Sequence, residues 1–134
     1  MALTADQRRF LEERHFSVLG TVNQHGAPHR TVMWYLLDGE EIVFNTKAGR
    51  KKESNLTRDP RVSLLVYDDS GYKYLRIDGR VRTITDPDVA HADIARLARR
   101  YNRDAAAADR AIARFNTEER ITYRLPIARV YDYR

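Results

Sequence analysis

Residues 16–46, FSVLGTVNQHGAPHRTVMWYLLDGEEIVFNT, decide the fold of this chain. Branched and aromatic side chains fill Phe16 to Asn23 and return in His29 to Leu37, and the residues between these two runs are typical of a turn. Asp38-Gly39 indicates a second tight turn, because both central positions of a type I′ turn need a positive φ. A third strand is predicted over Glu41 to Thr46. The stretch therefore predicts three strands that run as an antiparallel meander.

The rest of the chain adds strands and helices to this meander. Thr4 and Gln7 have the spacing of a capping box before a short helix, and Asp86-Pro87 begins a longer helix. The other predicted elements are a short helix over Arg50 to Leu56, strands over Arg61 to Tyr67, Tyr72 to Asp78 and Arg80 to Thr85, a helix that carries Ala108, Ile112 and Phe115, and a last strand from Ile121 to Tyr133 that Pro126 interrupts. Six to seven antiparallel strands without early strand-helix alternation predict a mainly β fold, a β-barrel with peripheral helices.

The composition bounds what this chain can be. Its 134 residues fit one domain over 1–134, and no apolar run approaches the ~18 residues of a membrane span. Met1 to Phe10 lack the apolar segment of a secretory signal, so a cytoplasmic location is expected. Without cysteine, disulfides and thiolate metal sites are excluded. The net charge of +5 allows an anionic partner such as a phosphate or a nucleic acid.

The most basic stretch runs from Lys47 to Arg61, with six basic residues and two acidic ones. A predicted strand ends in the hydroxyl residue Thr46, Gly49 then loosens the backbone, and cations stand where the helix over Arg50 to Leu56 would start. Helix amides, a hydroxyl and Arg or Lys side chains can all donate to one phosphate. A solvated basic loop is the alternative interpretation, because most charge runs are simply solvated.

Four segments stand in a characteristic order along the chain. They are the strand Phe16 to Asn23, the turn Gly26-Ala27-Pro28, the strand Thr31 to Tyr35, and the segment Asn55 to Val62. Their order and spacing resemble the pyridoxamine-phosphate-oxidase-like superfamily, in particular its actinobacterial deazaflavin-dependent branch, over nearly the whole chain. The resemblance implies a split β-barrel of the FMN-binding kind and a homodimer with the cofactor at the subunit interface. The implied cofactor is coenzyme F-420, an 8-hydroxy-5-deazaflavin, with FMN as the alternative.

The resemblance also implies which residues bind the cofactor. The residues expected to hold its phosphate are Thr46, Lys47, Arg50, Lys51, Lys52 and Asn55. The ring is expected to lie on the strand formed by Thr31, Val32, Met33 and Trp34, whose backbone edge can hydrogen-bond and whose side chains offer apolar walls. Tyr72 is expected to reach across to the cleft of the other subunit. Core packing is the alternative for Trp34, and covering the sheet edge is the alternative for Tyr72.

Several other chemistries have no support in the sequence. The histidines His15, His25, His29 and His91 show no metal-ligand spacing, so no metal site is predicted. No nucleophile elbow and no glycine-rich dinucleotide fingerprint are present, which argues against hydrolysis and against a Rossmann domain. No side chain stands out as a general acid, so no catalytic residue is named.

These observations lead to one main hypothesis and three alternatives. The main hypothesis is a reductase in which reduced coenzyme F-420 transfers hydride to an activated double bond, such as an enone or a quinone. The nearest alternative is an FMN-dependent oxidoreductase of the pyridoxamine-phosphate-oxidase kind. Against it, the sequence is not expected to contain the longer amino-terminal extension and the carboxyl-terminal substrate-closing segment of those oxidases. A protein that binds the deazaflavin without catalysis is a further alternative. The last alternative is a nucleic-acid-binding barrel that uses Arg50 to Arg61 to contact phosphates. Under the main hypothesis, neither a nucleic acid nor a membrane is expected as a partner.

Overall fold

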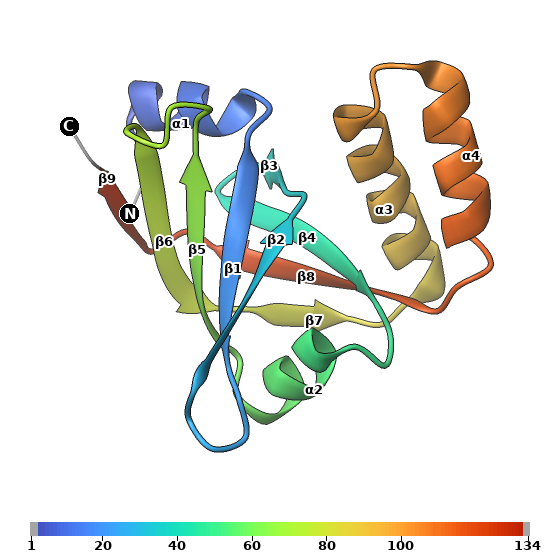
Figure 1. Ribbon diagram of the computed structural model, residues 1–134, viewed down its shortest axis with the longest axis horizontal. Helices are drawn as coiled ribbons and strands as arrows, with labels where there is room; N and C mark the ends of the chain where they lie inside the picture. The colour runs from blue at the N-terminus through green and yellow to red at the C-terminus, as the bar shows by residue number, and fades with distance from the viewer. Residues whose placement is uncertain (1–2, 133–134) are drawn as a thin grey trace.

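The structure, a computed structural model, describes residues 3–132. Its strands form two antiparallel sheets, and its helices pack around them (Figure 1). The strands are β1 (Phe16–Val22), β2 (Pro28–Met33), β3 (Leu36–Asp38), β4 (Glu41–Lys47), β5 (Arg61–Tyr67), β6 (Tyr74–Arg80), β7 (Arg82–Ile84), β8 (Arg120–Pro126) and β9 (Arg129–Asp132). The helices are α1 (Ala5–Glu12), α2 (Lys51–Arg58), α3 (Pro87–Tyr101) and α4 (Ala105–Phe115). One sheet has the order β2-β1-β5-β6-β9 and the other the order β3-β4-β8-β7. The prediction of a mainly β fold with peripheral helices is confirmed.

The core lies between the two sheets, because inward side chains alternate with outward ones along each strand. Leu19, Leu64 and Ile77 are neighbours on paired strands of the five-stranded sheet and are fully buried. Phe44 and Tyr123 of the four-stranded sheet join the same core, with their ring centroids 5.3 Å apart. No ladder joins the two sheets within residues 3–132, so the barrel is split rather than closed.

Two predicted strands are each divided between the sheets, and the described part of the chain therefore has nine strands instead of six or seven. The strand predicted over His29 to Leu37 stops after Met33, and β3 then pairs with β4 in the other sheet. The predicted three-strand meander within one sheet is therefore wrong, because β1 and β2 pair in the five-stranded sheet while β3 and β4 pair in the four-stranded sheet. The last strand divides in the same way into β8 and β9, while Tyr133 lies outside the described residues.

The turn between β3 and β4 differs from the predicted type I′. Asp38 pairs with Glu41, so Gly39 and Glu40 are the two central residues. Gly39 has a φ of 62°, whereas no non-glycine residue of the described chain has a positive φ. A positive φ at the first central position alone is the pattern of a type II′ turn, which also matches the twist of a hairpin.

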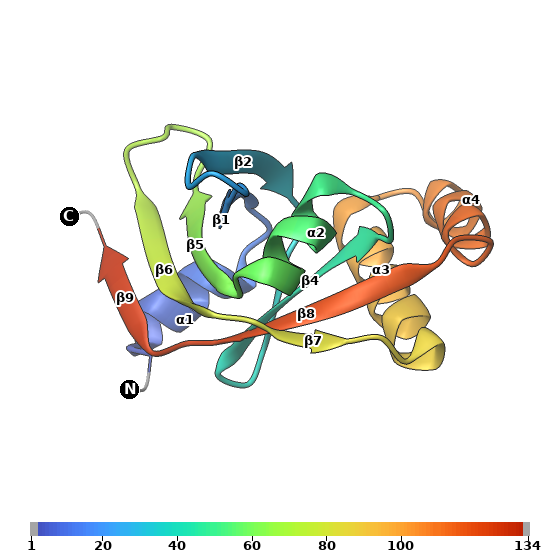
Figure 2. The ribbon, with the colours of Figure 1, turned by 90° about the horizontal axis from the view of Figure 1, so that it is seen from below.

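The helices cover the two sheets unequally, as Figures 1 and 2 show. The α3 and α4 helices lie side by side, and α3 packs on β4 and β8 through Ile94 and Leu97, which are buried against Val43. The predicted capping box at Thr4 is present at the start of α1. Among the helices of residues 3–132, none covers the outer face of the five-stranded sheet in this way, so that face stays open within the described chain.

None of the helices within residues 3–132 is long and apolar enough to cross a membrane.

Candidate functional site

A cleft of about 230 Å³ opens where the two sheets and three helices meet. Its walls come from the end of β2, the end of β4, the start of α2, the inner face of α3, the end of α4 and the first residue of β8. The lining residues are Val32, Met33, Trp34, Asn45, Thr46, Lys47, Arg50, Lys52, Ile94, Leu97, Phe115 and Arg120. The cleft thus draws on segments that are far apart in the sequence.

One side of the cleft is apolar and aromatic. Trp34 stacks on Tyr101 of α3, with ring centroids 5.3 Å apart and planes 3° apart, and Phe115 meets Trp34 edge-on at 6.4 Å. Leu97 and Ile94 continue this wall along α3. Flat apolar walls of this kind are typical of sites that bind aromatic ring systems.

The other side of the cleft is basic. Four of its described lining residues are cations, Lys47, Arg50, Lys52 and Arg120, and none is acidic. Burial lowers the pKa of Lys52, and the charges of Arg50 and Arg120 lower it further. Within residues 3–132, neither Arg50 nor Lys52 has a side-chain hydrogen bond or an ion pair, whereas Lys47 lies 3.7 Å from Glu118. Because these charges repel one another, an anion bound here would be stabilised.

Local sequence explains how the basic residues reach the cleft. The φ of 89° at Gly49 turns the chain out of β4, and the amide of Gly49 donates to Glu53 Oε1 at 2.6 Å. Arg50 then stands at the N-cap of α2, where its side chain forms no capping bond. The helix therefore starts with the exposed Arg50, whose guanidinium can donate to a ligand but cannot cap the helix amides, and with Lys52 buried.

Seven of the residues predicted from the sequence line this one cleft. They are Val32, Met33, Trp34, Thr46, Lys47, Arg50 and Lys52. Thr31 precedes them on β2 and is half-buried, but it is not part of the lining. Lys51 is exposed on α2 outside the lining.

Asn55 has a different role from the predicted phosphate ligand. It is fully buried, and its amide donates to Thr21 Oγ1 at 3.0 Å and to Asn23 Oδ1 at 3.1 Å. Its carbonyl oxygen accepts a bond from Arg58 at 2.9 Å. Asn55 therefore attaches α2 to the end of β1 and has no place in the cleft. The sequence could not distinguish these roles, since Asn55 and the cations share one short helix.

Tyr72 is also absent from the cleft of its own chain. It is 77% exposed in the loop before β6, beside a second hollow of about 490 Å³ between α1 and β6. Its predicted role in the other subunit's cleft stays a prediction.

Sequence reasoning missed Arg120, Asn45 and the helix residues of the apolar wall. Arg120 pairs across the strands with Lys47, and its Nε donates to Asn45 Oδ1 at 2.9 Å. The register of β8 against β4 sets this position, and no local pattern near Arg120 indicated it. Ile94 and Leu97 belong to the helix predicted to begin at Asp86-Pro87, and their contact with the cleft depends on how that helix packs on the sheet.

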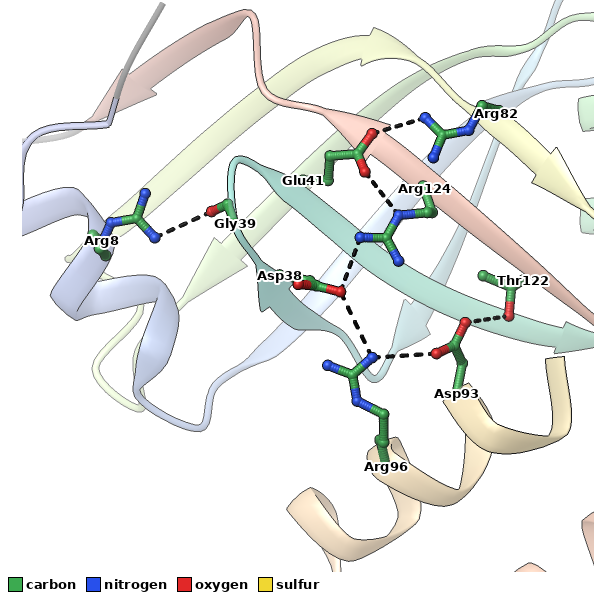
Figure 3. A network of polar contacts seen from close by, with 9 residues as sticks. All are labelled: Arg8, Asp38, Gly39, Glu41, Arg82, Asp93, Arg96, Thr122 and Arg124. Carbon is green, nitrogen blue, oxygen red and sulfur yellow. Dashed lines mark hydrogen bonds and ion pairs between the residues drawn. The ribbon is translucent and has the colours of Figure 1, made fainter. Parts of the chain in front are cut away.

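A polar network holds α3 against the four-stranded sheet next to the cleft (Figure 3). Thr122 donates to Asp93 at 2.9 Å, and Arg96 of the same helix approaches Asp93 at 3.3 Å and Asp38 at 3.7 Å. Arg124 donates to Asp38 at 2.9 Å and to Glu41, and its hydrogen bonds hold the pKa of both carboxyls below their ordinary values. The network fixes the wall that α3 contributes. Among residues 3–132, no group of three or more histidine and acidic side chains is arranged to hold a metal ion.

The profile of the pyridoxamine 5′-phosphate oxidase family matches residues 3–123, which include every residue that lines the cleft. The chain belongs to this family. A pyridoxine/pyridoxamine 5′-phosphate oxidase of Aeromonas hydrophila is 36% identical over 73 residues, which cover 54% of this chain and 35% of that enzyme. The chain thus spans about a third of the length of that relative.

One further relative and two solved structures are more similar in length. A coenzyme F-420-dependent biliverdin reductase of Mycobacterium tuberculosis is 29% identical over 101 residues, 74% of this chain and 72% of the reductase. The structure of an F-420 reductase has a TM-score of 0.76 at 25% identity and covers 96% of this chain and 98% of that one. A conserved hypothetical protein of Mycobacterium tuberculosis has a TM-score of 0.82 at 26% identity, over 99% of this chain and 85% of that one. The resemblance predicted from the sequence is confirmed.

The position of Asn55 leads to a prediction about stability. Asn55→Ala removes the two bonds that its amide donates, so the free energy of unfolding is expected to fall by about 1 to 3 kcal/mol. Urea denaturation measures this loss. Ser54→Ala, an exposed neighbour on the same helix, is the control and is expected to leave stability unchanged. Equal stability of the two variants would contradict the structural role of Asn55.

Proposed function

We propose that this protein is an oxidoreductase that binds coenzyme F-420 in the cleft and reduces an activated double bond, such as that of an enone or a quinone. The observation that carries the proposal is a flat aromatic wall around Trp34 that faces four cations, with no carboxylate among the lining residues that the structure describes. A deazaflavin combines a flat ring with a phosphodiester and an oligoglutamate tail. The names of two relatives, a biliverdin reductase and an F-420 reductase, support the same cofactor.

The described residues fit such a cofactor. Lys52 and Arg50 can donate to its phosphodiester, and Thr46 adds a hydroxyl at the same end of the cleft. The buried hydroxyl of Thr31 has no hydrogen-bond partner within residues 3–132, and it lies on the same side of β2 as Met33, which lines the cleft. An unsatisfied buried hydroxyl is costly, and a polar group of a ligand beside β2 would remove that cost.

The chain's own residues bind and orient rather than react. When bound, the reduced deazaflavin supplies a hydride from its ring carbon, and solvent supplies the proton that completes the reduction of the double bond. Trp34, Leu97 and Phe115 would exclude water from one side of the ring and hold the substrate's apolar part. The titratable groups among the described lining residues are the four cations, to which we assign the binding of anionic groups and not the transfer of a proton.

FMN is the alternative cofactor, favoured by the local match to the Aeromonas oxidase. One phosphate group needs fewer cations than the cleft provides, whereas the tail of coenzyme F-420 can use all four. A protein that only carries the deazaflavin would have the same cleft and would differ in turnover alone. A nucleic-acid-binding role is less well supported, because the cations surround a small cleft beside an apolar wall instead of following an open groove.

A fluorescence titration with coenzyme F-420, and in parallel with FMN at the same ionic strength, tests the proposal. Trp34 is the chain's one tryptophan and lines the cleft, so quenching of its emission is expected on binding. Tight binding of the deazaflavin is expected, followed by turnover with a panel of enones and quinones. Preference for FMN would support the oxidase alternative, binding without turnover the carrier, and binding of neither cofactor would refute the proposal.

Substitutions in α2 locate the phosphate. Lys52→Ala and Arg50→Ala are each expected to weaken the binding of coenzyme F-420 by about tenfold or more, because a charge-assisted hydrogen bond is lost. Lys51→Ala is the matched control, since Lys51 has the same charge on the same helix but lies outside the lining. An unchanged dissociation constant in both cleft variants would place the phosphate elsewhere.

We also propose that the open face of the five-stranded sheet pairs with a second copy of this chain. Register places Val32, Val18 and Leu65 side by side on that face, and the row continues through Arg76 to Tyr131. Val32 is 62% exposed, although large apolar side chains are usually covered. Because Val32 also lines the cleft, a partner on this face would complete the cleft's edge, as the homodimer expected from the sequence requires.

Leu65→Arg tests the homodimer. A charge at the centre of the apolar row is expected to convert the dimer into a monomer, which analytical ultracentrifugation measures. Val89→Arg places the same charge on α3, at an exposed apolar residue of the other side, and is expected to leave the dimer intact. A monomeric parent protein, or a Leu65→Arg variant that remains dimeric, would contradict this interface.

A further inference from the structure

Arg120 is held in a single orientation inside the cleft. It is only 8% exposed, and its Nη1 donates to Glu118 Oε1 at 3.0 Å while its Nε donates to Asn45. Its guanidinium lies over the ring of Phe115, 4.7 Å from the centroid. The remaining amino group, Nη2, has no hydrogen-bond partner within residues 3–132. The planar group is thus fixed on three sides with one donor group left over.

The residue that orients Arg120 is itself fixed. The amide of Asn45 donates to the carbonyl oxygen of Ala90 at 3.0 Å and to Thr122 Oγ1 at 3.1 Å. These bonds join β4 to α3 and to β8 beneath the cleft. Arg120 therefore loses little conformational freedom when it binds a ligand, in contrast to Arg50, which is exposed and has no side-chain partner within residues 3–132.

The negative charge of Glu118 does not balance the positive charges around Arg120. Glu118 also lies 3.7 Å from Lys47, which is paired directly with Arg120 across the strands. Like charges in that position destabilise a sheet. Burial is the main cause that lowers the pKa of Arg120, and the charge of Arg50 lowers it further; the hydrogen bond that Arg120 donates to Glu118 opposes this shift. One carboxylate thus faces several cations, and the excess positive charge lies on the cleft side.

We propose that Arg120 is an oxyanion ligand, separate from the cations of α2, that makes the cleft selective for molecules carrying a phosphate or a carboxylate. The Nη2 amino group of its guanidinium would donate to one oxygen of the ligand, and Lys52 would face the same oxyanion from the opposite side. The source of the oxyanion, either the tail of the cofactor or an acidic substrate, rests on the proposed function; the binding of the oxyanion does not.

Thermal denaturation with and without inorganic phosphate tests the ligand role without any cofactor. Phosphate is expected to raise the Tm of the parent protein above the value in chloride of equal ionic strength, because a ligand that binds the folded state stabilises it. The size of the Tm shift gives the dissociation constant of phosphate. This constant is expected to rise about tenfold or more in the Arg120→Gln variant, and Arg120→Lys is expected to recover part of the affinity.

Arg124→Gln is the matched control for the loss of an ion-paired arginine, although Arg124 is partly buried where Arg120 is buried. Arg124 lies on the same strand and pairs with Asp38 and Glu41 outside the cleft, so its loss is expected to lower the Tm without changing the phosphate shift. An Arg120→Gln variant with the parent's phosphate shift, or a parent protein that phosphate does not stabilise, would overturn the proposal.

Two ligand pairs then identify the source of the oxyanion. If the cofactor supplies it, Arg120→Gln loses affinity for coenzyme F-420 but not for its chromophore without the phosphodiester tail. If the substrate supplies it, the KM of a carboxylated enone rises and that of its neutral analogue does not. A parent protein that binds neither form of the deazaflavin would refute the proposed function, and the phosphate shift would still decide the role of Arg120.

Discussion

The passage of the chain from one sheet to the other at Trp34 and Tyr35 is the constraint on which the rest of the structure depends. Tyr35 turns inward and is completely buried, and its hydroxyl donates to the carbonyl oxygens of Leu11 at 2.9 Å and Glu13 at 3.2 Å. Burial raises the pKa of this hydroxyl, so it stays a neutral donor. Trp34 turns the other way and stacks on Tyr101, whose hydroxyl bonds to Tyr35 O at 3.3 Å. One dipeptide thus ties α1 to the core, positions α3 and supplies the aromatic wall of the cleft.

The cleft combines an apolar wall with uncompensated positive charge, and the two have opposite effects on the stability of the fold. The wall adds to stability, since Leu97 and Ile94 are buried in the contact between α3 and the four-stranded sheet. The cations oppose stability, because Lys52 is buried and has no ion pair within residues 3–132, and Lys47 stands opposite Arg120. Such a cluster of cations is typical of a binding site, where a ligand supplies the missing negative charge.

The unequal covering of the sheets places the cleft at a boundary. The four-stranded sheet is covered by α3, and α4 packs on α3, whereas the five-stranded sheet presents an open row that includes Val32. The cleft lies where the covered and the open regions meet, and Val32 belongs to both the row and the lining. A second molecule on the open face would therefore have direct access to the ligand, and the same surface would serve assembly and selectivity.

The sequence by itself determined the features that depend on neighbouring residues. The apolar and branched residues of Phe16 to Asn23 and Arg61 to Tyr67, the capping box at Thr4 and the breaks at Gly39 and Gly49 all act within a few residues, so they could be located without the fold. The basic start of α2 was local in the same sense. Only the tertiary structure decided that β2 and β3 separate and that Asn55 faces β1. It also brought Arg120 to Asn45, 75 residues away in the chain, because strand register and helix packing depend on contacts between distant segments that no local pattern contains.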